Sequence, residues 1–134
     1  MFLSLNSIMK KEVVSQILLP AFIMIVLDAI FISLNMRMFR NQVISVQRTD
    51  LTIKPLGAVL CYLVMLFALY HFIIRSRGSI WEAMRLGFVI FAVYETTSYA
   101  LLKNWKLETV LVDTLWGTAL FGLTTYFTYI FSRR

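Results

Sequence analysis

The sequence contains few of the residues that build disulfides, metal centres or reactive sites. Its single cysteine, Cys61, excludes an intramolecular disulfide framework and a thiolate cluster for zinc or iron–sulfur. Its single histidine, His71, is a poor metal ligand by itself. The two prolines and five glycines are too few for a linker or a low-complexity chain. We therefore expect no metal and no cofactor, and we interpret Cys61 as a small apolar side chain within a helix.

Charged residues are also scarce, at 15%, whereas 60% of the 134 residues are hydrophobic and the mean hydropathy is +0.78. A soluble domain of this size needs more polar surface, so the composition indicates an integral membrane protein. Much of the net charge of +6 lies in short basic clusters beside apolar runs, which indicates contact with lipid headgroups and not with nucleic acid. The predicted headgroup contacts are Lys10, Lys11, Arg37, Arg40, Arg75, Arg77, Arg133 and Arg134.

Four apolar runs are long enough to cross a bilayer, whose core of about 30 Å needs about 20 helical residues. They predict an all-α fold, a four-transmembrane-helix bundle that forms one domain over residues 1–134, with spans at about 13–34, 56–74, 80–102 and 107–131. Pro55 suits the first helical position of the second span, and Ser79 with Glu82 has the spacing of a capping box. Asn104 is the predicted cap of the fourth span.

The connections predict how the spans are arranged. Short turns around Gly78 and at Lys103–Lys106 make the flanking helices antiparallel neighbours. In the longer link, residues 35–54, apolar residues recur at helical spacing, namely Met36, Phe39, Val43 and Val46. A short amphipathic helix at the membrane surface fits this pattern, and an ordinary polar loop fits it equally well.

Four spans place both termini on one side of the membrane. Seven basic residues lie near that side and six near the other, so the positive-inside rule favours termini inside by a single residue. Trp81 and Trp105 stand at span ends, where tryptophan anchors a helix in the interface. The first run is longer than the apolar part of a signal peptide and contains Asp28, so we expect it to be retained. The sequence leaves open which membrane holds the protein.

Three of the predicted spans contain one acidic residue in their interior, Asp28, Glu95 and Asp113. Each lies six or seven residues from the membrane face opposite the termini, which places all three about 10 Å below that face at 1.5 Å per residue. A charged side chain at the bilayer centre costs about 2.5–3.5 kcal/mol on insertion scales, so such groups turn inward and find partners. We predict one polar cluster inside the bundle, made of Asp28, Tyr62, Glu95, Thr97, Ser98, Tyr99, Asp113, Trp116 and Gly117.

This polar cluster has two interpretations. As a structural element, it is a hydrogen-bonded network that fixes which helices pack together. As a functional site, it binds a proton, a cation or a polar ligand, because ionisable residues inside a membrane often mark such sites. Residue types and spacing by themselves favour neither interpretation.

The order of these residues resembles a known family. The stretches "VLDAIF", "MRMFR", "CYLVMLFALYHF", "GFVIFAVYETTSYALLKNW" and "VDTLWGT" are similar to the uncharacterised four-helix membrane proteins called domain of unknown function 2177. The resemblance covers nearly the whole chain after about the first dozen residues. Its most specific positions are Tyr94, Glu95, Thr97, Ser98, Ala100, Trp105, Asp113, Trp116, Gly117 and Thr118. It implies the fold and the importance of the acidic residues, and no activity.

The sequence also departs from the family pattern. Glu95 and Ser98 stand where the family usually has Asp and Asn, and Ile30–Ile32 occupies the region where a Trp often follows the first aspartate. A longer acid beside a shorter polar residue preserves a network but alters a finely shaped site. This departure favours the structural interpretation.

Three classes of function remain open. The favoured one is a structural or accessory component of a membrane or virion assembly, whose partners are the lipid bilayer and other membrane subunits or further copies of the chain. The alternative is a small transporter or a proton or cation pathway through the acids. A membrane enzyme is the least favoured class, since no nucleophile, metal set or phosphate-binding motif accompanies the acids.

Overall fold

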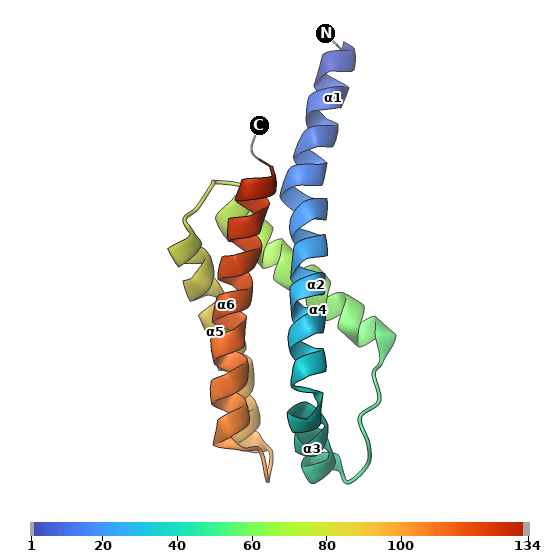
Figure 1. The fold of residues 1–134 in the computed structure, drawn as a ribbon, viewed down its shortest axis with the longest axis vertical. Helices are drawn as coiled ribbons and strands as arrows, with labels where there is room; N and C mark the ends of the chain where they lie inside the picture. Colours follow the sequence, from blue (N-terminus) through green and yellow to red (C-terminus); the bar gives the residue numbers. More distant parts are fainter. Residues whose placement is uncertain (1, 133–134) are drawn as a thin grey trace.

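The computed structural model describes residues 2–132, which are almost entirely helical (Figure 1). The elements in chain order are α1 (Phe2–Val13), the wide turn η1 (Val14–Leu18), α2 (Leu19–Leu34), α3 (Met36–Gln47), α4 (Pro55–Leu69), the wide turn η2 (Tyr70–Ile74), α5 (Ile80–Leu101) and α6 (Leu107–Phe131). Because α1, η1 and α2 follow one another without a break, they form one long helix. The described residues contain no strand, so the predicted all-α fold class is confirmed.

Three helices are long and apolar enough to cross a membrane, namely Ser4–Leu34, Pro55–Ile74 and Leu107–Phe131. They correspond to the first, second and fourth predicted spans. The first helix begins well before the predicted start at residue 13, and its 31 residues exceed the roughly 20 that a bilayer core requires. The predicted third span forms α5, which is less apolar because it contains Glu82, Arg85 and the polar run at residues 95–99.

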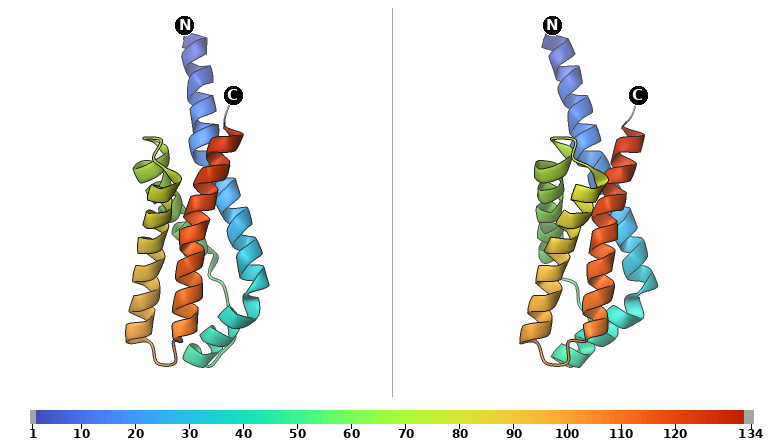
Figure 2. Two further views of the ribbon diagram at one scale, coloured as in Figure 1. Left: turned by 60° about the vertical axis from the view of Figure 1, so that its left-hand side comes forward. Right: turned by 90° about the vertical axis from the view of Figure 1, so that its left-hand side faces the viewer.

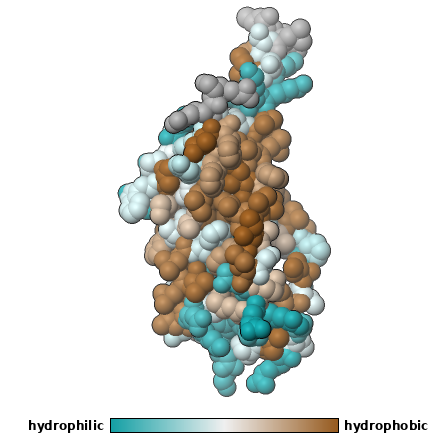
Figure 3. Space-filling view, viewed as in Figure 1, coloured by the Kyte–Doolittle hydropathy of each residue, from teal (hydrophilic) through white to brown (hydrophobic). Residues whose placement is uncertain are grey.

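Apolar side chains face outward along the middle of the molecule. Phe22, Leu63 and Phe67 are 67%, 57% and 62% exposed, although a protein in water would bury most such residues. Figure 3 shows the result on one face, a hydrophobic zone above a hydrophilic lower end where α3 and the α5–α6 turn lie. A surface of this kind is matched to hydrocarbon, so the surroundings of the middle zone are lipid.

The helices are packed most closely around α6. Helix α5 lies beside α6 along its length, and the chain reverses between them through residues 102–106 (Figure 2). Helix α2 also packs on α6, whereas α4 crosses behind α2 and touches it at few positions (Figure 1). The two ends of the described chain and the α4–α5 turn lie at one end of the molecule, while α3 and the α5–α6 turn lie at the other.

Two glycines explain the close packing of α5 on α6. A Cβ added to Gly87 would lie 2.3 Å from the carbonyl oxygen of Gly117. A Cβ added to Gly117 would lie 2.1 Å from the ring of Phe91. Both distances are far below van der Waals contact, so only glycine fits at these positions.

The start of two helices was correctly predicted. Pro55 is the first residue of α4, where its missing N–H costs no hydrogen bond. The Oγ of Ser79 accepts a hydrogen bond from the backbone N–H of Glu82 at 3.0 Å, as the capping-box spacing predicts. These signals succeed because they depend only on neighbouring residues.

The link between the first two long helices contains a helix, α3. The sequence fitted a short helix and a polar loop equally well there, and the structure has the helix. Its inward face carries Gln42, which is only 2% exposed. The Nε2 of Gln42 donates to the carbonyl of Asn104 at 2.9 Å, and its Oε1 accepts from the N–H of Lys106 at 2.9 Å and from the hydroxyl of Thr109 at 2.7 Å. These bonds fasten α3 to the α5–α6 turn.

The prediction that Asn104 caps α6 was wrong. Asn104 has a φ of 70°, a left-handed conformation that asparagine tolerates in tight turns. Its side chain donates instead to the carbonyl of Ser45 in α3, at 3.2 Å. Lys106 precedes α6, and Gln42 from α3 supplies the acceptor at this helix start. The sequence did not reveal this hydrogen bond because its acceptor lies more than 60 positions away.

We predict that Gly117→Ala destabilises the fold by about 1–3 kcal/mol, because its methyl group has no space against Phe91. Gly57→Ala is the matched control, since nothing lies within 4 Å of a Cβ there and alanine favours a helix by up to about 1 kcal/mol. Reversible unfolding in mixed detergent micelles measures both changes. Equal stability of the two variants would contradict the close α5–α6 contact.

Candidate functional site

The carboxyl group of Asp28 joins three helices. Asp28 lies in α2 and is only 8% exposed. Its Oδ2 accepts a short hydrogen bond from the hydroxyl of Tyr62 in α4, and its Oδ1 accepts one from the indole N–H of Trp116 in α6 at 2.8 Å. Both carboxylate oxygens therefore have donors from other helices. We call Asp28, Tyr62 and Trp116 the Asp28 group.

An aromatic stack covers the Asp28 group on one side. The ring of Phe31, one turn after Asp28, lies parallel to the Trp116 indole with centroids 4.5 Å apart. Phe39 of α3 then contacts Phe31 edge-on at 5.8 Å. The stack fixes the orientation of the indole and so the direction of its N–H bond. It also links α3 to the interior of the bundle.

A second carboxyl group is buried between α5 and the turn that follows it. Glu95 is only 1% exposed, and its Oε1 accepts a hydrogen bond from the indole N–H of Trp105 at 3.0 Å. The half-buried carboxyl group of Asp113 in α6 lies beside Glu95, with Asp28 farther away. We call Glu95, Trp105 and Asp113 the Glu95 group. Two carboxyl groups side by side in an apolar interior make this the most polar point of the α5–α6 interface.

The structure divides the predicted cluster instead of forming one. Asp28, Tyr62 and Trp116 lie in the first group, and Glu95 and Asp113 lie in the second. Within residues 2–132, no three histidine, cysteine or acidic side chains lie close enough to hold a metal ion. The two groups are nevertheless adjacent, because Trp116 and Asp113 are three residues apart on α6 and share one face.

Two predicted members lie outside both groups. Thr97 and Tyr99 are exposed on the outer side of α5, and Tyr99 is 51% exposed. Ser98 is buried and follows Glu95 by three residues, as predicted. Glu95 and Ser98 turn toward the interior, so positions 97 and 99 on either side of Ser98 turn away from it. The prediction for Thr97 and Tyr99 was wrong because an apolar helix does not reveal its rotation.

Sequence analysis also missed two polar contacts. Trp105, which we expected to anchor a helix end in the interface, folds back and donates to Glu95 instead. Gln42 was not considered, although it is a polar residue on the same face of its helix as Phe39 and Val46. A polar side chain on an apolar helix face is the signal that could have identified it, since such a group needs a buried partner.

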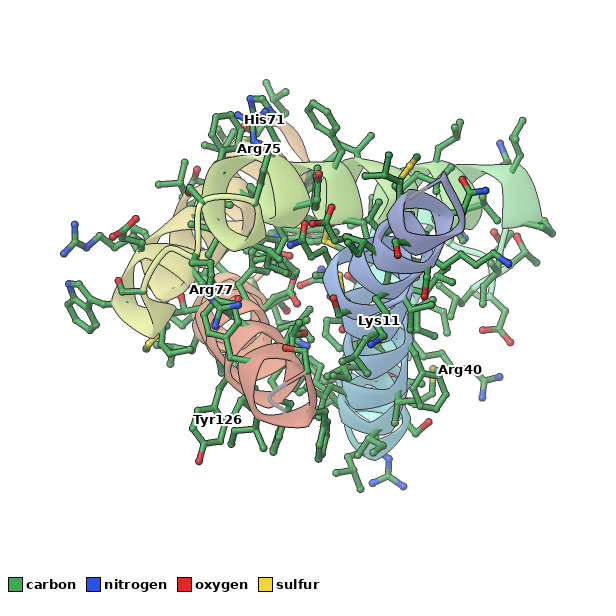
Figure 4. All side chains as sticks on the ribbon, turned by 90° about the horizontal axis from the view of Figure 1, so that it is seen from above. Lys11, Arg40, His71, Arg75, Arg77 and Tyr126 are labelled. Carbon is green, nitrogen blue, oxygen red and sulfur yellow. The ribbon has the colours of Figure 1, made fainter. Side chains whose placement is uncertain are left out.

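The predicted headgroup contacts are exposed where the structure describes them. Figure 4, seen from the end that carries the termini, shows Arg75 on the outer side of η2 and Lys11 and Arg77 nearer the middle. Arg77 lies over the ring of Tyr129, 5.0 Å from its centroid. Lys10 and Arg37 are exposed, and residues 133–134 lie outside the described part.

Arg40 already has a partner within the chain. Its guanidinium binds both oxygens of the Asp50 carboxylate, at 2.8 Å and 2.6 Å, on the exposed surface beside α3. This ion pair holds the pKa of Asp50 below its ordinary value, mainly through the hydrogen bonds from Arg40. A headgroup phosphate would have to compete with Asp50 for this arginine.

Comparison with known families identifies the chain. The model of a family described as a predicted membrane protein, DUF2177, matches residues 13–130. The chain belongs to this family. No curated protein and no solved structure matches it. The DUF2177 match confirms the resemblance seen in the residues, and it establishes a membrane protein whose activity is unknown. The matched residues include the carboxyl groups of Asp28, Glu95 and Asp113 and the residues that donate hydrogen bonds to Asp28 and Glu95.

We predict that Tyr62→Phe destabilises this DUF2177 protein by about 0.6–1.7 kcal/mol, the range for side-chain hydrogen bonds within membranes. The change removes a donor to Asp28 and leaves the ring in place. Tyr99→Phe is the control, because Tyr99 is exposed and should change stability by less than about 0.5 kcal/mol. Unfolding in mixed micelles reports both, and an unchanged Tyr62→Phe protein would show that the bond does not hold α4.

Proposed function

We propose that the chain is a four-span integral membrane protein with a structural or accessory role in a membrane assembly, and that it is not an enzyme. The observation that supports this most directly is the state of Asp28, whose two oxygens both accept hydrogen bonds from other helices. A carboxyl group held in this way links α2, α4 and α6. A network that fixes helix packing needs this arrangement, whereas a ligand site needs free polar atoms.

The fourth span in this proposal is α5. It has 22 residues, enough to cross a bilayer core of about 30 Å, and it lies along α6. Its two acidic residues have local explanations, since Glu82 lies in the first turn and Glu95 is buried against Trp105. The exposed positions in the middle of α5 are apolar, as in Phe88 and Val93, which are 51% and 60% exposed.

We predict that the two turns flanking α5 lie on opposite sides of the membrane. In a Cys61→Ser background, Ser76→Cys marks the α4–α5 turn and Lys103→Cys marks the α5–α6 turn, and both positions are exposed. A membrane-impermeant maleimide added outside sealed vesicles of one orientation should label only one of the two. The labelled turn also reports whether the termini face inward. Equal labelling of both turns from one side would place α5 outside the membrane.

The Glu95 group supports a second candidate, a proton or cation pathway. Glu95 and Asp113 lie side by side in the interior, and paired carboxyl groups are found on intramembrane proton routes. In a bundle of four helices a pathway would also need polar groups on both sides of this pair. The interior between the pair and the termini argues against that. Beside the hydroxyls of Thr124, Thr125 and Thr128 it contains apolar residues such as Met24, Leu69, Leu120 and Phe121, and the described residues place no further buried carboxyl group there.

We predict that vesicles containing the purified protein conduct no protons under an imposed membrane potential. Wild type, Asp28→Asn and Asp113→Asn should all match empty vesicles, as read by an internal pH dye between about pH 5 and 8. Asp28→Asn should instead lower thermal stability, because the amide cannot reproduce both acceptor bonds. Glu108→Gln is the control for the loss of an exposed carboxylate on α6.

A flux in wild type that Asp113→Asn abolishes and Glu108→Gln leaves intact would replace the structural role with the proton pathway. The accessory role has a separate readout. Proteins retained by the tagged wild type in mild detergent should be lost from Asp28→Asn and kept by Glu108→Gln. Identical retention by both variants would contradict a role of the Asp28 group in assembly.

A further inference from the structure

The outer face of α5 and α6 carries two adjoining hollows near the end of the molecule that holds the termini. Each has a volume of about 430 Å³. One lies over Ala119 and Gly122, and the other lies between Trp81 and Phe88 over Thr118. Met84 lines both, so its side chain is the ridge between them. The hollows exist because small residues of α6 form their floor.

Their lining is almost entirely carbon. The hydroxyl of Thr118 is turned back to the carbonyl of Thr114 in its own helix, at 3.0 Å, and so presents no free donor. Tyr126, at the upper edge of the first hollow, points away from the helix bundle in Figure 4. Two apolar hollows side by side on a membrane-facing surface match the two acyl chains of one lipid.

One positive charge lies at the edge of the second hollow. Arg85 is exposed, and its guanidinium lies 5.5 Å from the centre of the Trp81 ring. Within residues 2–132 the single ion pair joins Arg40 to Asp50, so Arg85 has no carboxylate partner. The acid nearest in sequence, Glu82, is held in the cap by Ser79, whose hydroxyl lies 3.4 Å from its Oε1.

The position of Arg85 along α5 suits a headgroup. It is five residues past Ile80, or about 8 Å from the helix start at 1.5 Å per residue, and a long side chain reaches that distance to the interface. An unpaired guanidinium at this depth requires an anion, and a phosphodiester accepts two of its N–H bonds at once. The terminal end adds Lys10 and Lys11, which favour a net negative headgroup.

We propose that this face binds one diacyl phospholipid with a net negative headgroup. Arg85 binds the phosphate, Trp81 packs beside the headgroup region, and the two acyl chains lie on either side of Met84. The proposal rests on α5 being a membrane span. The turn-labelling experiment tests that span by itself. If the two turns are labelled from opposite sides but the lipid experiment fails, the result contradicts the lipid site and leaves the span in place.

The test uses the full chain in nanodiscs of phosphatidylcholine with a small fraction of phosphatidylglycerol that carries a photoreactive acyl chain. After irradiation and digestion, crosslinks should concentrate at residues 84–89 and 118–123. Arg85→Gln should lower their yield about fivefold, the factor expected when one basic residue loses its attraction to an anionic lipid. Arg75→Gln, an exposed arginine with no hollow beside it, should leave the yield unchanged.

A second variant separates the contribution of the acyl-chain hollow from the contribution of the Arg85 charge. Ala119→Leu fills the floor of the first hollow and keeps Arg85, so crosslinks near Leu123 should disappear while those near Phe88 persist. Photoreactive phosphatidylcholine should crosslink several-fold less than phosphatidylglycerol at the same fraction. Equal yields from the two lipids, or an Arg85→Gln yield equal to that of Arg75→Gln, would overturn the proposal and leave only unspecific contact with the bilayer.

Discussion

The rest of the structure depends on the hydrogen bonds that Asp28 accepts. In hydrocarbon a carboxyl group has no water to bind, so its position is decided by the donors that reach it. Tyr62 comes from α4 and Trp116 from α6, and both meet Asp28 in α2. Helix α4 has few other contacts with α2, so this bond accounts for the place where the two helices cross. Phe31 stacks on Trp116 and contacts Phe39 edge-on, which extends the same constraint to α3.

Different interactions hold the helices together in the two halves of the molecule. Toward the termini, Met24, Leu69 and Phe121 form a core of apolar side chains. These side chains are held by van der Waals contacts, which have no strong directional preference and so tolerate small displacements of the helices. Toward the α5–α6 turn, Gln42 and the Glu95 group supply directional bonds. This half can hold polar groups because the turn provides donors that a continuous helix lacks, such as the N–H of Lys106 and the indole of Trp105.

These observations connect the fold to the proposed role. An interior whose helices are joined by the hydrogen bonds to Asp28 and by the close α5–α6 contact gives a rigid body, and the exposed apolar surface is then what the protein offers to its surroundings. Asp113 differs from the other interior acids because it is half-buried beside a second carboxyl group and not opposite a tryptophan donor. The two apolar hollows on α5 and α6 lie toward the termini, away from the Glu95 group near the α5–α6 turn.

The sequence by itself determined the all-α fold class and the first residues of α4 and α5, since these depend on composition and on short-range spacing. It also identified Tyr62, Trp116 and Gly117 as interior residues. Only the tertiary structure decided the partner of Glu95, the outward position of Thr97 and Tyr99, and the hydrogen bonds between Gln42 of α3 and the start of α6. The physical reason is that these membrane helices are apolar on nearly every side. Their pattern therefore carries no signal of which face turns inward, and packing against the neighbours sets that rotation.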